Sequence, residues 1–139
     1  MNFALRTLWT CLVMMAFATG LARAADGNVI DPAEAAKRVA AGTAVLVDVR
    51  EPAEWETGVV ASAALLPLSD LKGDRKAWAP FLEANKGKEI ILYCRSGNRA
   101  GQAAALLSAE GKATANAGGF SAWEAAGQPV RTPATKASK

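Results

Sequence analysis

The chain has 139 residues, which is enough for one domain of ordinary size and too few for two. Apolar residues make up 51% of the chain and charged residues 21%, with a formal net charge of +3, so a chain that is disordered by composition is excluded. There is no histidine and there are only two cysteines. Catalysis by a Cys–His or Ser–His pair, histidine-ligated zinc and a four-cysteine metal site are therefore excluded.

The first 24 residues have the pattern of a secretory signal peptide. A short segment with one positive charge precedes an apolar run from about Leu8 to Phe17, and Ala22-Arg23-Ala24 supplies the small residues that signal peptidase requires. An uncleaved membrane anchor is the alternative, but the run is shorter than the roughly 20 residues needed to span a bilayer. We predict that residues 1–24 are cleaved, that the protein is periplasmic, and that no stable membrane association remains.

Cleavage would change both the charge and the cysteine count. Lys plus Arg falls from 16 to 14 while Asp plus Glu stays at 13, so the net charge becomes +1 and no nucleic-acid partner is indicated. One cysteine, Cys94, remains, and a single cysteine cannot form an internal disulfide. Cys94 is then either an inert buried thiol or a reactive one, and its neighbours in the sequence must distinguish the two.

In chain order, the first predicted helix begins after the capping residue Asp31 and runs to Ala41. A continuous apolar run at 44–49 predicts a strand that is buried on both faces, as in a parallel sheet. A short acidic helix is predicted at 51–56 and a short strand at 63–66, where Pro follows.

The second half of the chain repeats this alternation. Residues 70–85 have partly helical spacing that Gly and Pro interrupt, which predicts one broken helix or two short ones. The remaining predictions, in order, are a buried strand at 89–93, a loop at 94–98, a helix at 99–110, a short strand at 112–117, a turn at 118–119, a helix at 120–126 and a flexible tail at 131–139. Strands that alternate with helices predict a single α/β domain, at residues 25–130, with a mainly parallel sheet.

The segment 94–99 (Cys-Arg-Ser-Gly-Asn-Arg) lies where a strand ends and a helix begins, which is where such sheets bind ligands. Loop N–H groups and the positive end of a helix dipole form a cradle for anions, and Gly97 and Asn98 tolerate the backbone that it needs. A thiol there is stabilised as thiolate without a histidine base. Arg95 and Arg99 would add donors for an incoming oxyanion. Inert core packing is the alternative, but these neighbours favour a reactive cysteine.

Three motifs together resemble the single-domain rhodanese family, and the similarity extends from about residue 29 to 130. The motifs are the six-residue active-site loop Cys94-Arg95-Ser96-Gly97-Asn98-Arg99, the upstream segment 46–52 with Trp55 and Gly58 after it, and the downstream Gly-Gly and Ala-Trp signature at 118–123. With its signal peptide, the chain is similar to the small periplasmic rhodaneses of the phage shock protein E type.

The resemblance implies a rhodanese-like α/β domain with about five mainly parallel strands flanked by helices. It implies a thiosulfate sulfurtransferase in which Cys94 is catalytic and carries the sulfur as a persulfide to cyanide or a thiol. The substrate-binding residues would be Arg95, Ser96, Gly97, Asn98 and Arg99. The implied partners are a small-molecule sulfur donor and acceptor, with no metal or organic cofactor, and we expect a monomer. Asp48 and Arg50 resemble family positions near the site and would either brace the loop or form a plain surface pair.

Two other functions stay open. A persulfide carrier or partner-docking module with little turnover would use the same cysteine. Cysteine-dependent phosphatases and arsenate reductases of similar fold have the loop arginine six positions after the cysteine, where this chain has Ala100, so its shorter loop favours sulfur transfer. The family's Gly-His-Ile segment is replaced by residues 58–60 (Gly-Val-Val), which leaves the acceptor preference open.

The remaining aromatic and acidic residues near these motifs are expected to be structural. We predict that Trp55, Trp78 and Trp123 belong to the core rather than to a substrate platform. The acidic residues between 51 and 56 are expected to form a solvated helix face.

Overall fold

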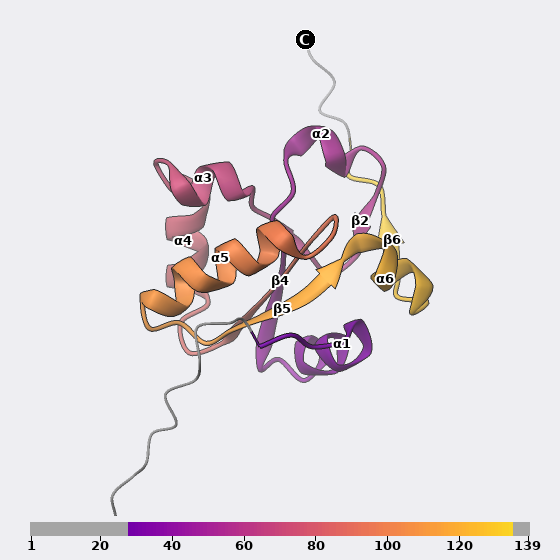
Figure 1. The fold of residues 1–139 in the computed structure, drawn as a ribbon, viewed down its shortest axis with the longest axis horizontal. Helices are drawn as coiled ribbons and strands as arrows, with labels where there is room; N and C mark the ends of the chain where they lie inside the picture. Colours follow the sequence, from indigo (N-terminus) through magenta and orange to yellow (C-terminus); the bar gives the residue numbers. More distant parts are fainter. Residues whose placement is uncertain (1–27, 135–139) are drawn as a thin grey trace, which may run out of the picture.

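A computed structural model describes residues 28–134, so the predicted signal peptide and the last five residues lie outside the described residues. The central sheet has the order β3-β1-β4-β5, and all of its pairings are parallel (Figure 1). Its strands are β1 (Ala44–Asp48), β3 (Ala64–Leu65), β4 (Glu89–Cys94) and β5 (Thr114–Gly119). The predicted α/β architecture is confirmed, with four strands in this sheet rather than about five.

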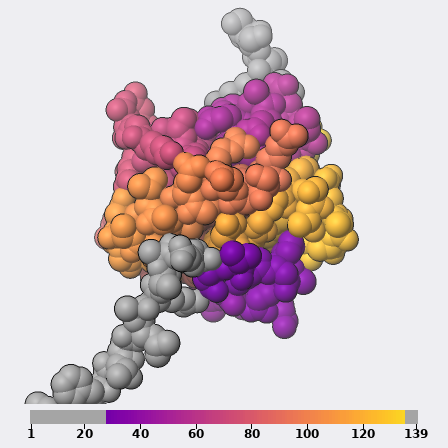
Figure 2. Space-filling model, viewed as in Figure 1, coloured from indigo at the N-terminus to yellow at the C-terminus, as the bar shows by residue number. Residues whose placement is uncertain are grey.

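Six helices flank the sheet in the described part of the chain. They are α1 (Pro32–Ala40), α2 (Pro52–Trp55), α3 (Leu68–Lys72), α4 (Trp78–Ala84), α5 (Asn98–Ala109) and α6 (Phe120–Ala125). One core cluster joins the sheet to α3, α4 and α5, and a second joins it to α1 and α6. Helix α5 lies across the middle of the face seen in Figure 2. Within residues 28–134 no helix has the length and apolar character needed to cross a membrane.

Side chains that point alternately to the two faces of β1 and β4 contribute to both core clusters. Val47 and Leu92 belong to the cluster under α5, whereas Leu46, Ile91 and Tyr93 belong to the cluster under α1 and α6. Successive side chains of a strand point to opposite faces, so a sheet covered on both sides needs apolar residues at every position. This explains the unbroken apolar runs in the sequence, and full burial of each large aliphatic side chain contributes about 1.5–3 kcal/mol.

Helix ends follow the signals in the sequence. The Asp31 carboxylate accepts a hydrogen bond from the Glu34 N–H at 2.9 Å and caps α1, as predicted. The interrupted segment folds as two short helices, α3 and α4. The Asp70 carboxylate accepts three backbone N–H groups at the start of α4, from residues 76, 77 and 78, at 3.0–3.1 Å. Trp78 and Trp123 are buried in the core as predicted, whereas Trp55 is only partly buried.

A second, two-stranded antiparallel sheet was not predicted. It pairs β2 (Val59–Val60) with β6 (Val130–Arg131). Arg131, which the sequence assigned to the flexible tail, lies in β6, and its guanidinium donates to the Ala61 and Ala63 carbonyls at 3.1 Å. The predicted turn at 118–119 is instead the end of β5, where the register with β4 shifts. Two-residue strands carry no periodicity, so the sequence had no signal for this sheet.

Candidate active site

Cys94 is the last residue of β4 and lies directly beneath its own loop. The side chain is 1% exposed, and the Gly97 N–H donates a hydrogen bond to Sγ at 3.0 Å. Gly97 has φ +93°, a left-handed conformation that glycine adopts without strain, and it is the residue from which α5 begins. Sγ therefore receives one backbone donor and lies near the positive end of a twelve-residue helix.

The loop is supported from β5 by Asn116, which the sequence analysis missed. Its amide Nδ2 donates to the Gly97 carbonyl at 3.0 Å, and its Oδ1 accepts from the Gly118 N–H at 2.9 Å. The same glycine thus binds Asn116 through its carbonyl and Cys94 through its N–H. A polar residue between two buried alanines of a strand was the signal available in the sequence.

Close backbone contact between β5 and the loop depends on Gly119. A side chain built at this position would overlap the carbonyl group of Arg95, so no residue with a Cβ fits without displacing the loop. Gly119, the second residue of the Gly-Gly pair, is therefore required by the packing of the active-site loop.

Arg99, from the first turn of α5, is paired with Glu54 of α2. Nη1 and Nη2 lie 2.6 and 2.7 Å from the two carboxylate oxygens, which is a bidentate ion pair. The hydrogen bonds from Arg99 lower the pKa of Glu54 to about 2, and Glu54 in turn raises the pKa of Arg99. The sequence predicted a solvated Glu54 and an Arg99 that reaches for substrate; in the structure the two side chains lock α2 to the start of α5.

Asp48 and Arg50 form a buried ion pair rather than a surface pair. Arg50 Nη2 donates to Asp48 Oδ2 at 2.7 Å and to the Gly58 carbonyl at 2.7 Å, and its guanidinium carbon lies 4.5 Å from the centre of the Phe120 ring. Burial lowers the pKa of Arg50, but the bonds to Asp48 outweigh this effect and raise it. The pair ties the end of β1 to the segment before β2 and to α6, so it is a brace behind the site.

Tyr93 lies beside this brace and stays protonated. Burial, and then the charge of Asp48, raise the pKa of Tyr93, while its hydroxyl oxygen accepts a hydrogen bond from the Val60 N–H at 2.9 Å. Its ring stacks on Phe120 and tilts against Trp123. Tyr93 is therefore a packing residue that carries one structural hydrogen bond.

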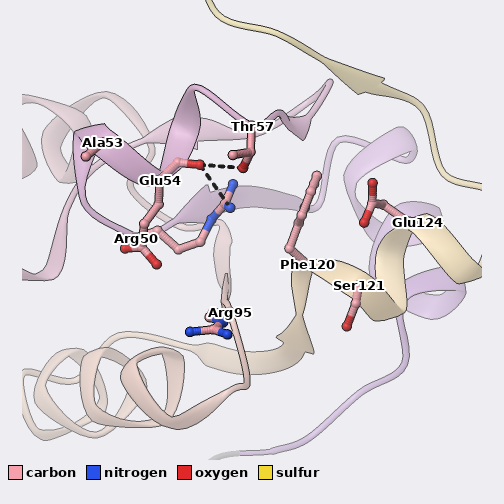
Figure 3. Close-up of a pocket in the computed structure, with 8 residues that line it drawn as sticks. All are labelled: Arg50, Ala53, Glu54, Thr57, Arg95, Phe120, Ser121 and Glu124. Atoms are coloured by element: carbon pink, nitrogen blue, oxygen red, sulfur yellow. Dashed lines mark hydrogen bonds between the residues drawn. The ribbon is translucent and has the colours of Figure 1, made fainter.

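A cavity of about 520 Å³ opens next to the loop (Figure 3). It is lined by residues from the end of β1, from α2, from the cysteine loop and from α6: Arg50, Ala53, Glu54, Thr57, Arg95, Phe120, Ser121 and Glu124. Arg95 is the loop residue in this wall, and its neighbour Cys94 is not among the lining residues. Ser96 and Asn98 are exposed on the loop outside the cavity wall.

Among the described residues, no group of three or more Cys, Asp or Glu side chains is placed to hold a metal ion.

Comparison with known proteins places this arrangement among sulfur-handling domains. The sequence model of the Rhodanese-like domain matches residues 31–126. A sulfurtransferase of Allochromatium vinosum is 33% identical over 109 residues, which cover 76% of this chain and 96% of that protein. Two other curated relatives are longer, and the matched part of this chain spans 46% of one and 27% of the other.

Two solved structures give the same picture of the fold. A rhodanese-related protein from Thermoplasma volcanium has a TM-score of 0.63 and 27% identity, with 76% of this chain and 98% of that chain covered. A protein of unknown function from Rhodopseudomonas palustris, described as a possible tyrosine phosphatase, has a TM-score of 0.62 and 26% identity, with 76% and 85% covered.

Proposed function

This chain belongs to the rhodanese-like family, and we propose that it is an exported sulfurtransferase that moves a sulfane sulfur from thiosulfate or a similar donor to a thiophilic acceptor. A sulfurtransferase relative of nearly the same extent supports sulfur transfer in general. The observation that carries the proposal is the setting of Cys94, whose Sγ receives the Gly97 N–H at 3.0 Å at the entrance to α5.

In the first half-reaction the Cys94 thiolate attacks the outer sulfur of thiosulfate. A bond forms between Sγ and that sulfur, the S–S bond of thiosulfate breaks, and sulfite leaves with the electron pair. The N–H groups at the start of α5 stabilise the negative charge at the reacting sulfurs. Arg95, exposed at the mouth of the site, offers the sulfonate group a cation.

In the second half-reaction the acceptor attacks the outer sulfur of the Cys94 persulfide. A bond forms between the acceptor and that sulfur, the S–S bond to Sγ breaks, and its electron pair stays on Sγ as thiolate. The outer sulfur lies about 2 Å beyond Sγ, so loading extends the reactive atom outward from its buried position. Each half-reaction forms one bond to sulfur and breaks another, without any oxidant.

Phosphoryl transfer fits the site less well. The arginine of a phosphate-binding loop has to direct its N–H groups at the anion. Nη1 and Nη2 of Arg99 are instead held by Glu54 at 2.6 and 2.7 Å. The description of the Rhodopseudomonas palustris protein as a possible phosphatase therefore finds no support in the geometry of this chain.

The proposal is tested by following sulfur on Cys94. We expect the purified, reduced protein to gain the mass of one sulfur atom on incubation with thiosulfate and to release thiocyanate when cyanide is added, whereas Cys94→Ser should do neither. Slow discharge that one partner protein accelerates would favour a persulfide carrier. Absence of any sulfur gain from thiosulfate or other sulfane donors, in folded protein, would contradict both. The proposed export is checked by cell fractionation and by the mass of the mature N-terminus, which we expect to be Ala25.

A further inference from the structure

Two of the charged groups in the wall of the cavity are already neutralised. Arg50 is paired with the buried carboxylate of Asp48 at 2.7 Å, and Glu54 is paired with Arg99 at 2.6 Å. Arg50 also donates to the Gly58 carbonyl and lies over the Phe120 ring, and Glu54 also accepts from the Glu51 N–H. Neither of them has a net charge to offer to a molecule that enters the cavity.

The two other charged groups of the wall have opposite signs and no such partner. Arg95 and Glu124 are exposed, and neither forms an ion pair or a side-chain hydrogen bond with another residue between 28 and 134. In Figure 3 Arg95 extends from the cysteine loop on one side of the cavity and Glu124 lies on α6 on the other, with Phe120 and Ser121 between them. The cavity therefore presents one cation near the reactive cysteine, one anion across from it and a phenyl ring.

We infer that the sulfur acceptor is a small thiol that carries both an ammonium and a carboxylate group, as a thiol of the α-amino-acid type does. The inference rests on the proposed sulfurtransferase function. Arg95 would bind the carboxylate, Glu124 the ammonium group, and Phe120 the aliphatic part of the molecule. Cyanide has no group that would use both Arg95 and Glu124, and a thiol with carboxylates alone would meet Glu124.

The transfer step balances without a further reactant. The acceptor thiol loses its proton to solvent, and its thiolate attacks the outer sulfur of the Cys94 persulfide. The S–S bond to Sγ breaks, its electron pair stays on Sγ, and the acceptor leaves as a persulfide that keeps the proton of the transferred sulfur. Arg95 and Glu124 are acceptor-binding residues in this step, since neither touches the reacting sulfur atoms.

A matched set of four thiols tests the inference. Cysteine carries both charges, cysteine methyl ester only the ammonium, N-acetylcysteine only the carboxylate, and N-acetylcysteine methyl ester neither. The protein is loaded with thiosulfate, freed of donor, checked by intact mass, and mixed with each thiol in single turnover. The donor half-reaction then does not contribute to the measured rate. Each variant is compared with wild type for the same thiol, so the pKa of that thiol does not affect the comparison.

We expect Glu124→Gln to lower the rate with cysteine and its methyl ester about two- to fivefold relative to the rate with the N-acetyl compounds, as for an exposed charge pair. Glu124→Lys should shift that ratio further, by about tenfold, in favour of N-acetylcysteine. The control Glu83→Gln, which removes an exposed carboxylate on α4, away from the cavity, should leave every ratio unchanged.

Equal ratios in wild type and both Glu124 variants, with sulfur loading intact, would overturn the acceptor inference and leave the sulfurtransferase in place. A protein that never gains sulfur would instead remove the proposed function and the acceptor inference with it. The mass measured before any thiol is added distinguishes these two failures.

Discussion

Two ion pairs flank the candidate site, and they differ in burial. Asp48–Arg50 joins residues two apart in sequence, with side chains 0% and 5% exposed, and its remaining donors bind backbone carbonyls. Glu54–Arg99 joins residues 45 apart, with side chains 32% and 28% exposed, at the edge of the cavity. The first is a brace on which the surrounding structure depends, because a buried charge without its partner is costly. The second, Glu54–Arg99, is a latch between α2 and α5, and water and salt weaken its contribution to stability.

The largest effect is expected from Asp48→Asn, which keeps the shape of the brace and removes its negative charge. The guanidinium of Arg50 would remain buried and uncompensated, and breaking a buried pair in this way costs about 3–5 kcal/mol. Urea denaturation at neutral pH measures the loss. A change below about 1 kcal/mol would mean that water reaches Arg50 and that the two pairs do not differ in kind.

Asn116 of β5 supports the cysteine loop with hydrogen bonds between uncharged groups. Asn116→Ala removes the donor to Gly97 and the acceptor of Gly118, and we expect it to lower the free energy of unfolding by about 1–2 kcal/mol. Because Gly97 also donates to Sγ, Asn116→Ala should in addition lower the rate at which Cys94 gains sulfur from thiosulfate.

Asn85→Ala is the matched control for this change. The Asn85 amide donates to the Phe81 carbonyl at 2.8 Å at the end of α4, away from the loop. It should lower stability by a similar amount and leave the rate of sulfur gain on Cys94 unchanged. An equally unchanged rate in Asn116→Ala would show that Asn116 acts on stability alone.

Glu54→Gln should have the smallest effect on stability, about 1 kcal/mol or less at neutral pH and less still in high salt. Glu54 has a pKa lowered from 4.5 to about 2, so its stabilising contribution is complete above pH 4.5 and is lost as the pH falls toward 2. The difference in unfolding free energy between wild type and Glu54→Gln should therefore shrink across that range. A difference that grows on acidification would contradict a stabilising role for the Glu54–Arg99 pair.

A distal ion pair of similar exposure separates stability from function. Arg75 and Glu110 lie 2.6 Å apart with side chains 33% and 37% exposed, close to the values for Glu54 and Arg99. Glu110→Gln should match Glu54→Gln in stability, while only Glu54→Gln should alter the rate of persulfide formation, because only its partner begins the helix above Cys94. Equal rates in the two variants would show that Arg99 does not position the loop.

Much of the architecture was available from the sequence because its causes are local. The apolar runs at 44–49 and 89–93 specify buried strands, and the Asp31 cap specifies the start of α1. The loop with its cysteine and glycine lies between a strand and a helix, as predicted, since the chain passes from one to the other within four residues. Such features depend on neighbours in the chain, so periodicity and spacing record them.

Only the tertiary structure decided what each charged or polar group near Cys94 does. Glu54 meets Arg99 across 45 residues, Asn116 meets Gly97 across 19, and Val59 pairs with Arg131 at the far end of the domain. None of these contacts leaves a pattern in the sequence, because each depends on how separate elements pack. Position in the loop predicted Arg99 as a substrate-binding residue, and only the tertiary structure shows that its guanidinium is also paired with Glu54 of α2.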